Sequence, residues 1–174
     1  MAQIDLIPFT EADIGRLLGW VTSLETHLLW TAAVFEYPLA PELFRKFLEE
    51  SAARGDRLFY KAVESATGEV VGHLELGAID RRNQCLRIGR VLVAPGAQGH
   101  GVGTAMMRAA LEIAFGRMGM HRAELGVFDV NQGAVACYEK VGFRYEGKRR
   151  ESFKAPEGFW SEITMSVLAE EWQP

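Results

Sequence analysis

The sequence has little cysteine and no long apolar run, and both features narrow the kind of protein it encodes. Cys85 and Cys137 are its two cysteines, and they stand far apart. This spacing fits neither a disulfide scaffold nor a cysteine-based zinc site. No apolar stretch approaches the ~20 residues that a membrane-spanning helix needs, and the first ten residues lack the basic and apolar segments of a signal peptide. We therefore expect a cytoplasmic protein with no membrane partner.

The sequence also lacks an excess of positive charge. Its 19 Lys and Arg residues are outnumbered by 23 Asp and Glu residues, which gives a formal net charge of −4. Nucleic-acid-binding proteins usually present a basic surface, so we expect no nucleic-acid partner. His27 and His121 have no second metal ligand at helical or strand spacing, so we expect no metal site. A length slightly above ~150 residues favours one domain over residues 1–174.

Hydrophobic periodicity predicts a mixed α/β fold. Ile14, Leu17, Leu18 and Val21 recur at helical spacing, and further helices are expected from Pro41 to a stop at Gly55, over 102–117 and over 132–140. Strands are expected at 4–8, 58–64, 70–79, 85–93, 122–128, 143–153 and 159–168. The turns between 58 and 93 are too short for parallel crossovers, whereas 85–128 reads as one strand–helix–strand crossover. The prediction is an α+β fold with a mostly antiparallel sheet flanked by helices.

A glycine-rich segment joins the strand at 85–93 to the helix that starts at 102. It reads Gln98-Gly99-His100-Gly101-Val102-Gly103-Thr104. Glycines let the backbone approach a ligand closely, and the unpaired amides and dipole of a helix N-terminus attract anions. The segment therefore predicts a phosphate or diphosphate site. A Rossmann site would need glycine where Thr104 stands, and a P-loop would need lysine after Gly103.

The same segment resembles the acyl-coenzyme A loop of the GNAT superfamily of N-acetyltransferases, [Gln/Arg]-x-x-Gly-x-[Gly/Ala]. A second run is similar to the family's N-x-x-A-x-x-x-Y-E-K-x-G-F pattern and comprises Asn131, Ala134, Tyr138, Glu139, Lys140, Gly142 and Phe143. The tail with Gly158, Trp160 and Glu162 resembles the Rim-type branch, whose members acetylate ribosomal-protein N-termini. The resemblance covers residues 58–168 well. It implies a GNAT-like fold whose closing strands often pair between subunits, so that a homodimer is compatible with it.

The resemblance also implies that acetyl-coenzyme A (acetyl-CoA) is the cosubstrate and that its acetyl group passes directly to an amine, on a protein N-terminus or a small molecule. A backbone N–H of Leu92 or Val93 would then stabilise the oxyanion. Asn131 would either contact the cofactor or only cap its helix. The cofactor contacts implied are Val91, Leu92, Val93, Gln98, Gly99, His100, Gly101, Val102, Gly103, Thr104, Asn131 and Tyr138.

The resemblance implies that Tyr138 is the candidate general acid, a role that a phenol held within hydrogen-bond reach of the leaving thiolate can perform. The alternative is a tyrosine that only packs on its helix face. Several family members carry a glutamate base eleven residues before the loop's first glutamine, and Arg87 stands at that position. His73 and Glu75, which share one face of a strand, are therefore the candidate bases, although each also fits an ordinary polar strand position.

Acceptor recognition is assigned to Trp30, Phe35, Glu36, Tyr37 and Glu162, a set of aromatics and acids that suits a cationic amine. The aromatic members of this set fit a hydrophobic core equally well. Two other functions stay open. One is a non-catalytic module that binds or senses acyl-coenzyme A, and the other is a nucleotide-binding domain.

Overall fold

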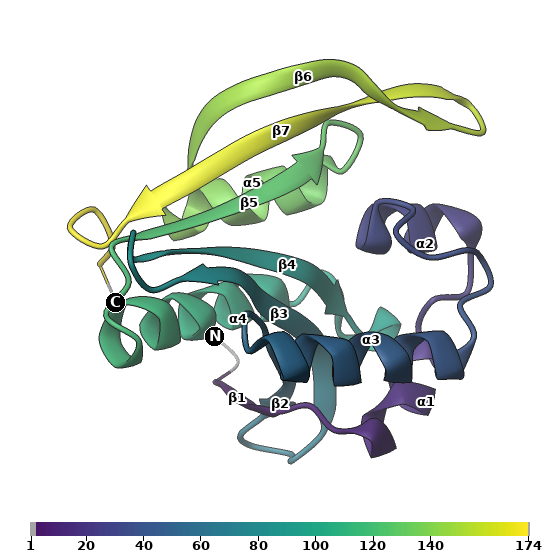
Figure 1. Cartoon of the computed structure of the whole chain (residues 1–174), viewed down its shortest axis with the longest axis horizontal. Helices are drawn as coiled ribbons and strands as arrows, with labels where there is room; N and C mark the ends of the chain where they lie inside the picture. The colour runs from purple at the N-terminus through teal and green to yellow at the C-terminus, as the bar shows by residue number, and fades with distance from the viewer. Residues whose placement is uncertain (1–2, 174) are drawn as a thin grey trace.

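One seven-stranded sheet organises the computed structural model, which describes residues 3–173. Met1, Ala2 and Pro174, which the single-domain prediction includes, lie outside the described residues. The strand order is β1-β2-β3-β4-β5-β7-β6 (Figure 1). The strands are β1 (Ile4–Pro8), β2 (Leu58–Glu64), β3 (Val70–Asp80), β4 (Cys85–Val93), β5 (Arg122–Phe128), β6 (Arg144–Ala155) and β7 (Gly158–Leu168).

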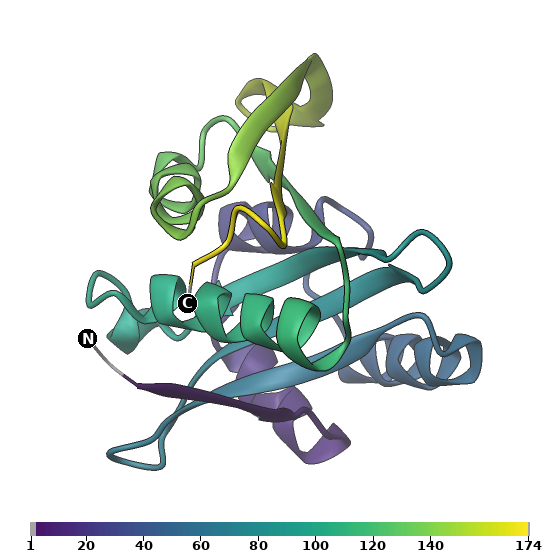
Figure 2. The same ribbon diagram turned by 90° about the vertical axis from the view of Figure 1, so that its left-hand side faces the viewer.

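Helices cover both faces of this sheet (Figures 1 and 2). They are α1 (Ile14–Gly19), α2 (Leu24–Thr31), α3 (Pro41–Arg54), α4 (Val102–Leu111) and α5 (Gln132–Val141), with the short segments η1 (Glu11–Asp13), η2 (Pro95–Ala97) and η3 (Glu112–Arg117). Side chains from α4 and α5 share a core cluster with Leu74 and Leu76 of β3. A second cluster on the other face joins α1, α2 and α3 to Leu92 of β4. The core thus lies in two layers, one on each side of the central strands.

The predicted crossover between β4 and β5 is confirmed, and it is the feature that positions the site. Neighbouring strands pair antiparallel except β4 and β5, which run parallel. Their pairing covers only Cys85–Arg87 against Arg122–Glu124. Beyond this short ladder the two strands separate, as Figure 1 shows toward the end of β4 that faces α2. The separation leaves a backbone edge of β4 without a strand partner.

The predicted α3 is confirmed, and its ends follow from the sequence. Pro41 occupies the first turn, where its missing N–H costs nothing, and Gly55 closes the helix in a left-handed conformation at φ 68°. The predicted helix at 102–117 is also present, although its last six residues, η3, form a π-helix.

The N-terminal helices differ from the prediction. The helix α1 ends at Gly19, so Val21 lies beyond it, and the following chain forms α2, which the periodicity did not indicate. Only eight residues long, α2 buries Leu28 and Trp30 together with the polar His27 and Thr31. Its start carries a local signal nevertheless, because the Ser23 side chain accepts a hydrogen bond from the Thr26 N–H at 3.1 Å.

No helix within residues 3–173 combines the length and the apolar character needed to cross a membrane.

Candidate active site

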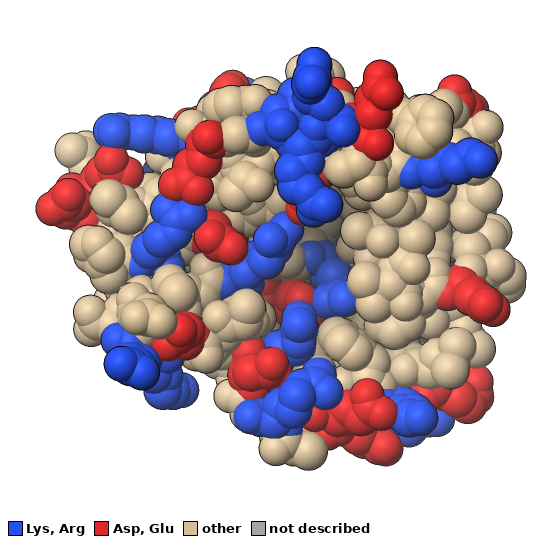
Figure 3. Space-filling model, turned by 45° about the horizontal axis from the view of Figure 1, so that its top comes forward, with Lys and Arg blue, Asp and Glu red and all other residues tan. Residues whose placement is uncertain are grey.

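A cleft of about 1010 Å³ opens where β4 and β5 separate. Its walls come from β4, the glycine loop and the first turn of α4 on one side, and from β5, α5 and α2 on the other. Figure 3 shows a hollow in the surface with acidic and basic side chains in and around it. The predicted site residues that line the cleft are Trp30, Glu75, Val91, Leu92, Val93, Gln98, Gly99, Gly101, Val102, Gly103, Thr104, Asn131, Tyr138 and Glu162.

The glycine loop presents backbone amides to one end of the cleft. Gly99 and Gly101 both have φ 79°, a conformation that residues with a Cβ rarely adopt. Gly101 is the N-cap of α4 and provides no side-chain cap, so the N–H groups of the first turn are free to bind a ligand. The first backbone bond into this helix runs from the Ala105 N–H to the Gly101 carbonyl. Free amides together with the helix dipole fit the diphosphate of a coenzyme.

The open edge of β4 distinguishes Val93 from Leu92. The Ala94 N–H donates to the Val71 carbonyl of the β3 side at 2.8 Å. Because successive amides of a strand point to opposite sides, the Val93 N–H faces the cleft and the Leu92 N–H faces β3. The Gln98 side chain lies on the same edge, where its Nε2 donates to the Val93 carbonyl at 3.3 Å. Of the two predicted oxyanion donors, the strand geometry therefore retains Val93 and excludes Leu92.

Tyr138 reaches the cleft from α5 with only 8% of its surface exposed. Burial is the main cause that raises its pKa above the ordinary value, and the neighbouring Cys137 acts in the same direction. The phenol therefore keeps its proton at neutral pH, as a general acid must. It also packs against Phe143, with 6.0 Å between ring centroids, so the packing role and a role in the cleft are compatible.

Asn131 and Thr104 support the cleft walls. The Asn131 side chain accepts a hydrogen bond from the Ala134 N–H at 3.2 Å and so caps α5, while the residue also lines the cleft. The Thr104 hydroxyl lies 3.4 Å from the Cys137 sulfur and links the first turn of α4 to α5. The first contact fixes the start of α5, and the second joins α5 to α4 at the cofactor end of the cleft.

Glu75 lies at the other end of the cleft, between two arginines. Arg57 Nη1 donates to Glu75 Oε1 at 2.7 Å, and Arg90 Nη1 donates to the same oxygen at 2.5 Å. The second oxygen, Oε2, is buried and has no hydrogen-bond partner among the described residues. The strand pattern at 70–79 indicates Glu75 as a candidate base, but nothing in the sequence indicates that Arg57 and Arg90 contact it. Arg90 lies in a strand irregularity at φ 45°, and Arg57 precedes β2.

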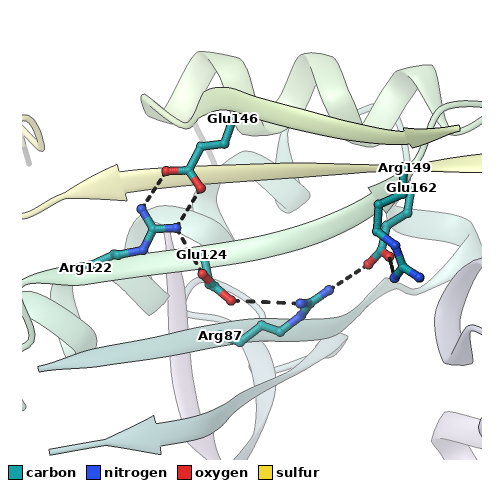
Figure 4. Close-up of polar contacts among 6 residues, drawn as sticks. All are labelled: Arg87, Arg122, Glu124, Glu146, Arg149 and Glu162. Carbon is teal, nitrogen blue, oxygen red and sulfur yellow. Dashed lines mark hydrogen bonds and ion pairs between the residues drawn. The ribbon is translucent and has the colours of Figure 1, made fainter. Parts of the chain in front are cut away.

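Glu162 belongs to a ladder of charged side chains across β4, β5, β7 and β6 (Figure 4). Arg87 Nη2 donates to Glu162 Oε1 at 2.9 Å, and Arg149 Nη1 donates to Glu162 Oε2 at 3.1 Å. Gly126 of β5 makes room for this contact, because a Cβ there would collide with Arg87 Nη2 and Glu162 Oε1. The ladder continues through Arg87 and Glu124 to Arg122 and Glu146. Arg87 stands where several family members have a glutamate, and its charge is paired with Glu162 of β7.

The assignment of His73 as a base is corrected by its surroundings. His73 shares a face of β3 with Glu75 as predicted, but it is 1% exposed and lies against Phe9 and Phe44 outside the cleft. Burial, the largest cause, and the charge of Arg90 together lower its pKa to about 3, while the charge of Asp13 acts in the opposite direction. A ring that cannot reach the cleft cannot take a proton from an acceptor there.

The predicted acceptor-binding aromatics are mostly core or surface residues. Trp30 is 5% exposed and donates its indole N–H to the Arg90 carbonyl at 2.9 Å, although it also lines the cleft. Phe35 packs against Phe44 and Phe47. The exposed Glu36 and Tyr37, like Phe35, are not part of the cleft wall. His100 is exposed and also lies outside that wall, so its predicted cofactor contact does not follow from the geometry.

Across residues 3–173, no three His, Cys, Asp or Glu side chains come together in a way that could hold a metal ion.

Several known acetyltransferases are similar to this chain in sequence or in structure. A spermidine N(1)-acetyltransferase of Vibrio cholerae is 31% identical over 112 residues, which is 64% of this chain and 61% of that relative, so the match spans less than two thirds of it. A phosphinothricin N-acetyltransferase of Streptomyces coelicolor is 26% identical over 91% of this chain and 92% of its own. A crystal structure of the Vibrio cholerae spermidine N-acetyltransferase in complex with CoA and spermine has a TM-score of 0.86 at 19% identity, covering 97% of both chains.

These relatives support the resemblance to the GNAT superfamily but not the resemblance to its Rim-type branch. They are named for spermidine and phosphinothricin, and the resemblance to the Rim-type branch is not supported. The sequence pattern of the acetyltransferase (GNAT) family matches residues 15–143, most of the chain. The matched region contains the glycine loop, the open edge of β4 and Tyr138. The chain therefore belongs to the acetyltransferase (GNAT) family and is an acetyltransferase that uses acetyl-coenzyme A.

Proposed function

We propose that this protein transfers the acetyl group of acetyl-coenzyme A to a primary amine of a small molecule, by direct attack while both substrates are bound. One observation carries the proposal. A single cleft extends from the uncapped start of α4, past the free edge of β4 and Tyr138, to the charged cluster around Glu75. A cosubstrate bound by its diphosphate at the first end would have its acyl end directed toward the second.

Three groups of this chain divide the chemical work. Acetyl-coenzyme A supplies the thioester carbonyl, where a C–N bond forms as the C–S bond breaks. The Val93 N–H donates to the carbonyl oxygen as negative charge develops there. Tyr138, protonated at neutral pH because burial raises its pKa, gives its proton to the departing sulfur.

Glu75 is the base candidate that remains at the cleft, and we include it in the proposal. Its Oε2 has no partner within residues 3–173, whereas both oxygens of Glu162 accept hydrogen bonds from arginines. In this proposal the acceptor amine does not contact Oε2 directly, because Oε2 is buried. A water between them passes the amine proton to Glu75. An acceptor amine of low pKa needs little help, since a usable fraction of it is already neutral near pH 7.

The experiment is a panel of amines incubated with acetyl-coenzyme A, with free thiol as the readout and mass spectrometry of the products. The panel includes amino acids, simple alkylamines, polyamines and short peptides with free N-termini. Acetylation of a small-molecule amine supports the proposal. Acetylation restricted to peptide N-termini, or coenzyme A binding without transfer to any amine, contradicts it. Homodimer formation stays a prediction, which light scattering on the purified protein tests.

A further inference from the structure

The acceptor end of the cleft contains a compact group of three charged side chains, Arg57, Glu75 and Arg90, here called the acceptor triad. Both arginines donate to the same oxygen of Glu75, at 2.7 and 2.5 Å. The side chains are largely removed from solvent, with 24%, 5% and 11% exposure respectively. All three line the cleft. The acceptor triad is therefore a partly buried charge cluster, with Glu75 at its buried centre, at the end of the cleft where the proposed function places the acceptor.

The surrounding strands leave room for the acceptor triad. A Cβ on Gly77 would lie 2.8 Å from Arg57 Nη1, and a Cβ on Gly89 would lie 3.2 Å from Glu75 Oε1. A Cβ at Gly77 would displace the Arg57 guanidinium, and a Cβ at Gly89 would shift Glu75 by a few tenths of an ångström. Arg90 lies in the β4 irregularity at φ 45°, opposite the register shift between His73 and Glu75. Irregularities of this kind re-aim a side chain.

An aromatic ring supports both guanidinium groups. The Phe47 centroid lies 4.6 Å from the guanidinium carbon of Arg90 and 5.5 Å from that of Arg57. Phe35 adds a second ring 5.6 Å from Arg90. Cation–π contacts of this kind hold the guanidinium groups without neutralising their charge. Phe35, predicted as an acceptor contact, thus acts on the cleft through Arg90.

The acceptor triad carries one more positive charge than negative. Asp56 also pairs with Arg57, at 4.0 Å between Oδ1 and Nε, but it lies closer to Arg54, at 3.5 Å. With Arg54 and Asp56 included, the group still carries one more positive charge than negative. Glu162 does not offset this excess positive charge either, because it already forms ion pairs with Arg87 and Arg149. An excess positive charge that is largely removed from solvent is unfavourable, so this end of the cleft favours a ligand that brings a negative charge.

We propose that the acceptor carries an anionic oxyacid group beside its amine, as an amino acid does, and that Arg57 and Arg90 bind this group. The inference rests on the amine acetyltransferase function proposed above and specifies its substrate class. Guanidinium groups match planar oxyacids because their donors form a rigid fork. Each arginine has five N–H donors, and Glu75 takes one from each. A polyamine would instead place further cations against a cluster that is already positive.

The experiment compares matched acceptors on the wild-type enzyme. Each amino acid is paired with the amine left after its carboxylate is removed, such as leucine with 3-methylbutylamine, and spermidine is a separate acceptor. A hydrogen-bonded charge contact predicts that kcat/KM for the best amino acid exceeds that for its paired amine by about tenfold to a hundredfold. Equal or faster acetylation of the paired amines, or a preference for spermidine over every amino acid, overturns the inference while leaving amine acetylation intact. Coenzyme A binding with no transfer to any acceptor overturns the proposed function and the inference with it.

Variants then assign the preference to the acceptor triad. Arg57→Gln is expected to lower the ratio of kcat/KM between amino acid and paired amine by about tenfold. Arg57→Lys, which keeps the charge but loses the fork, restores part of that ratio. Arg45→Gln is the matched control, because it removes an equally charged side chain from α3 that pairs with Glu11 away from the cleft. A ratio that stays constant in Arg57→Gln overturns the role of the triad. If that variant does not fold, the wild-type comparison of paired acceptors still decides the substrate class.

Discussion

The two ends of the cleft are lined by different kinds of chemical group. The cofactor end consists of main-chain groups, namely the amides of the first turn of α4 and the free edge of β4. The acceptor end consists of charged side chains from β3, β4, β7 and the residue before β2. Backbone amides recognise a diphosphate whatever the nearby side chains are, whereas side chains set selectivity one by one. Substitutions at the cofactor end should therefore weaken coenzyme A binding whichever acceptor is used. Substitutions at the acceptor end should change which acceptor is acetylated.

The largest expected effect comes from a group that belongs to neither end. Tyr138→Phe removes the phenolic hydroxyl and leaves the buried ring and its contact with Phe143. General acid catalysis contributes about 10²- to 10⁴-fold, so kcat should fall by that factor. The dissociation constant of coenzyme A should stay the same, because the proposed diphosphate contacts are main-chain amides. A thiol-release assay and calorimetry measure the two quantities.

Tyr145→Phe provides the control for Tyr138→Phe. Tyr145 is 57% exposed on β6, so the same chemical change there should leave kcat unaffected. A loss of coenzyme A affinity as large as the loss of kcat in Tyr138→Phe would show that Tyr138 acts in binding rather than in proton transfer.

The next effect concerns the helical layer that supports the acceptor end. Burial by itself would raise the pKa of Asp13, but hydrogen bonds from Lys61, Thr10 and Arg16 outweigh it and lower the pKa to about 2. Because this folded-state pKa lies below the unfolded value of 3.8, ionised Asp13 adds about 2 kcal/mol of stability above pH 4. That contribution is lost as the pH falls through 2.

Denaturant unfolding of wild type and Asp13→Asn at pH 2, 3, 4 and 7 measures this contribution. The difference in unfolding free energy between the two proteins should grow from pH 2 to pH 4 and then remain constant. A difference that is the same at every pH would mean that the Asp13 charge is not the stabilising feature.

The same contrast between backbone and side chains explains what could be predicted from the sequence. The glycine loop and Tyr138 lie in local patterns, where spacing along the chain decides the geometry. The strands and the crossover followed from alternation and turn length. The choice between Leu92 and Val93 could not be made from spacing, since it depends on which amide faces β3, and that requires the register of the Ala94–Val71 bond.

The acceptor end was predicted poorly because its contacts join distant parts of the chain. Glu75 was found, but Arg57 lies 18 positions before it and Arg90 lies 15 after it, and no local pattern links them. His73 and Glu75 looked equivalent on one strand face. Only the packing of Phe9 and Phe44 around His73 separates a core residue from a cleft residue.

A smaller effect is expected from the cofactor end. Gly101→Ala places a Cβ in open space but at φ 79°, whereas Gly96→Ala, in η2 just before the glycine loop, meets neither a close contact nor a positive φ. The left-handed conformation costs roughly 1–2 kcal/mol for a residue with a Cβ. Coenzyme A should therefore bind about 5- to 30-fold more weakly to Gly101→Ala and normally to Gly96→Ala, with the ranking of acceptors unchanged in both. Calorimetry provides the affinities, and equal weakening in both variants would contradict a conformational requirement at Gly101.

The smallest effect is expected at the acceptor end, from a substitution of Gly126 in β5. A Cβ at Gly126 would collide with Arg87 Nη2 and Glu162 Oε1, so Gly126→Ala should separate that ion pair and shift Glu162 in the cleft wall. The pair is partly exposed and its contribution is at most about 1 kcal/mol, so the acceptor KM should change by no more than about fivefold. Coenzyme A affinity should not change, because the proposed diphosphate site is at the opposite end of the cleft. Gly147→Ala on β6, where a Cβ meets nothing within 4 Å, is the control. A loss of coenzyme A affinity in Gly126→Ala that exceeds its effect on the acceptor KM would mean that the two ends are mechanically coupled through β5, and the division between a backbone end and a side-chain end would fail.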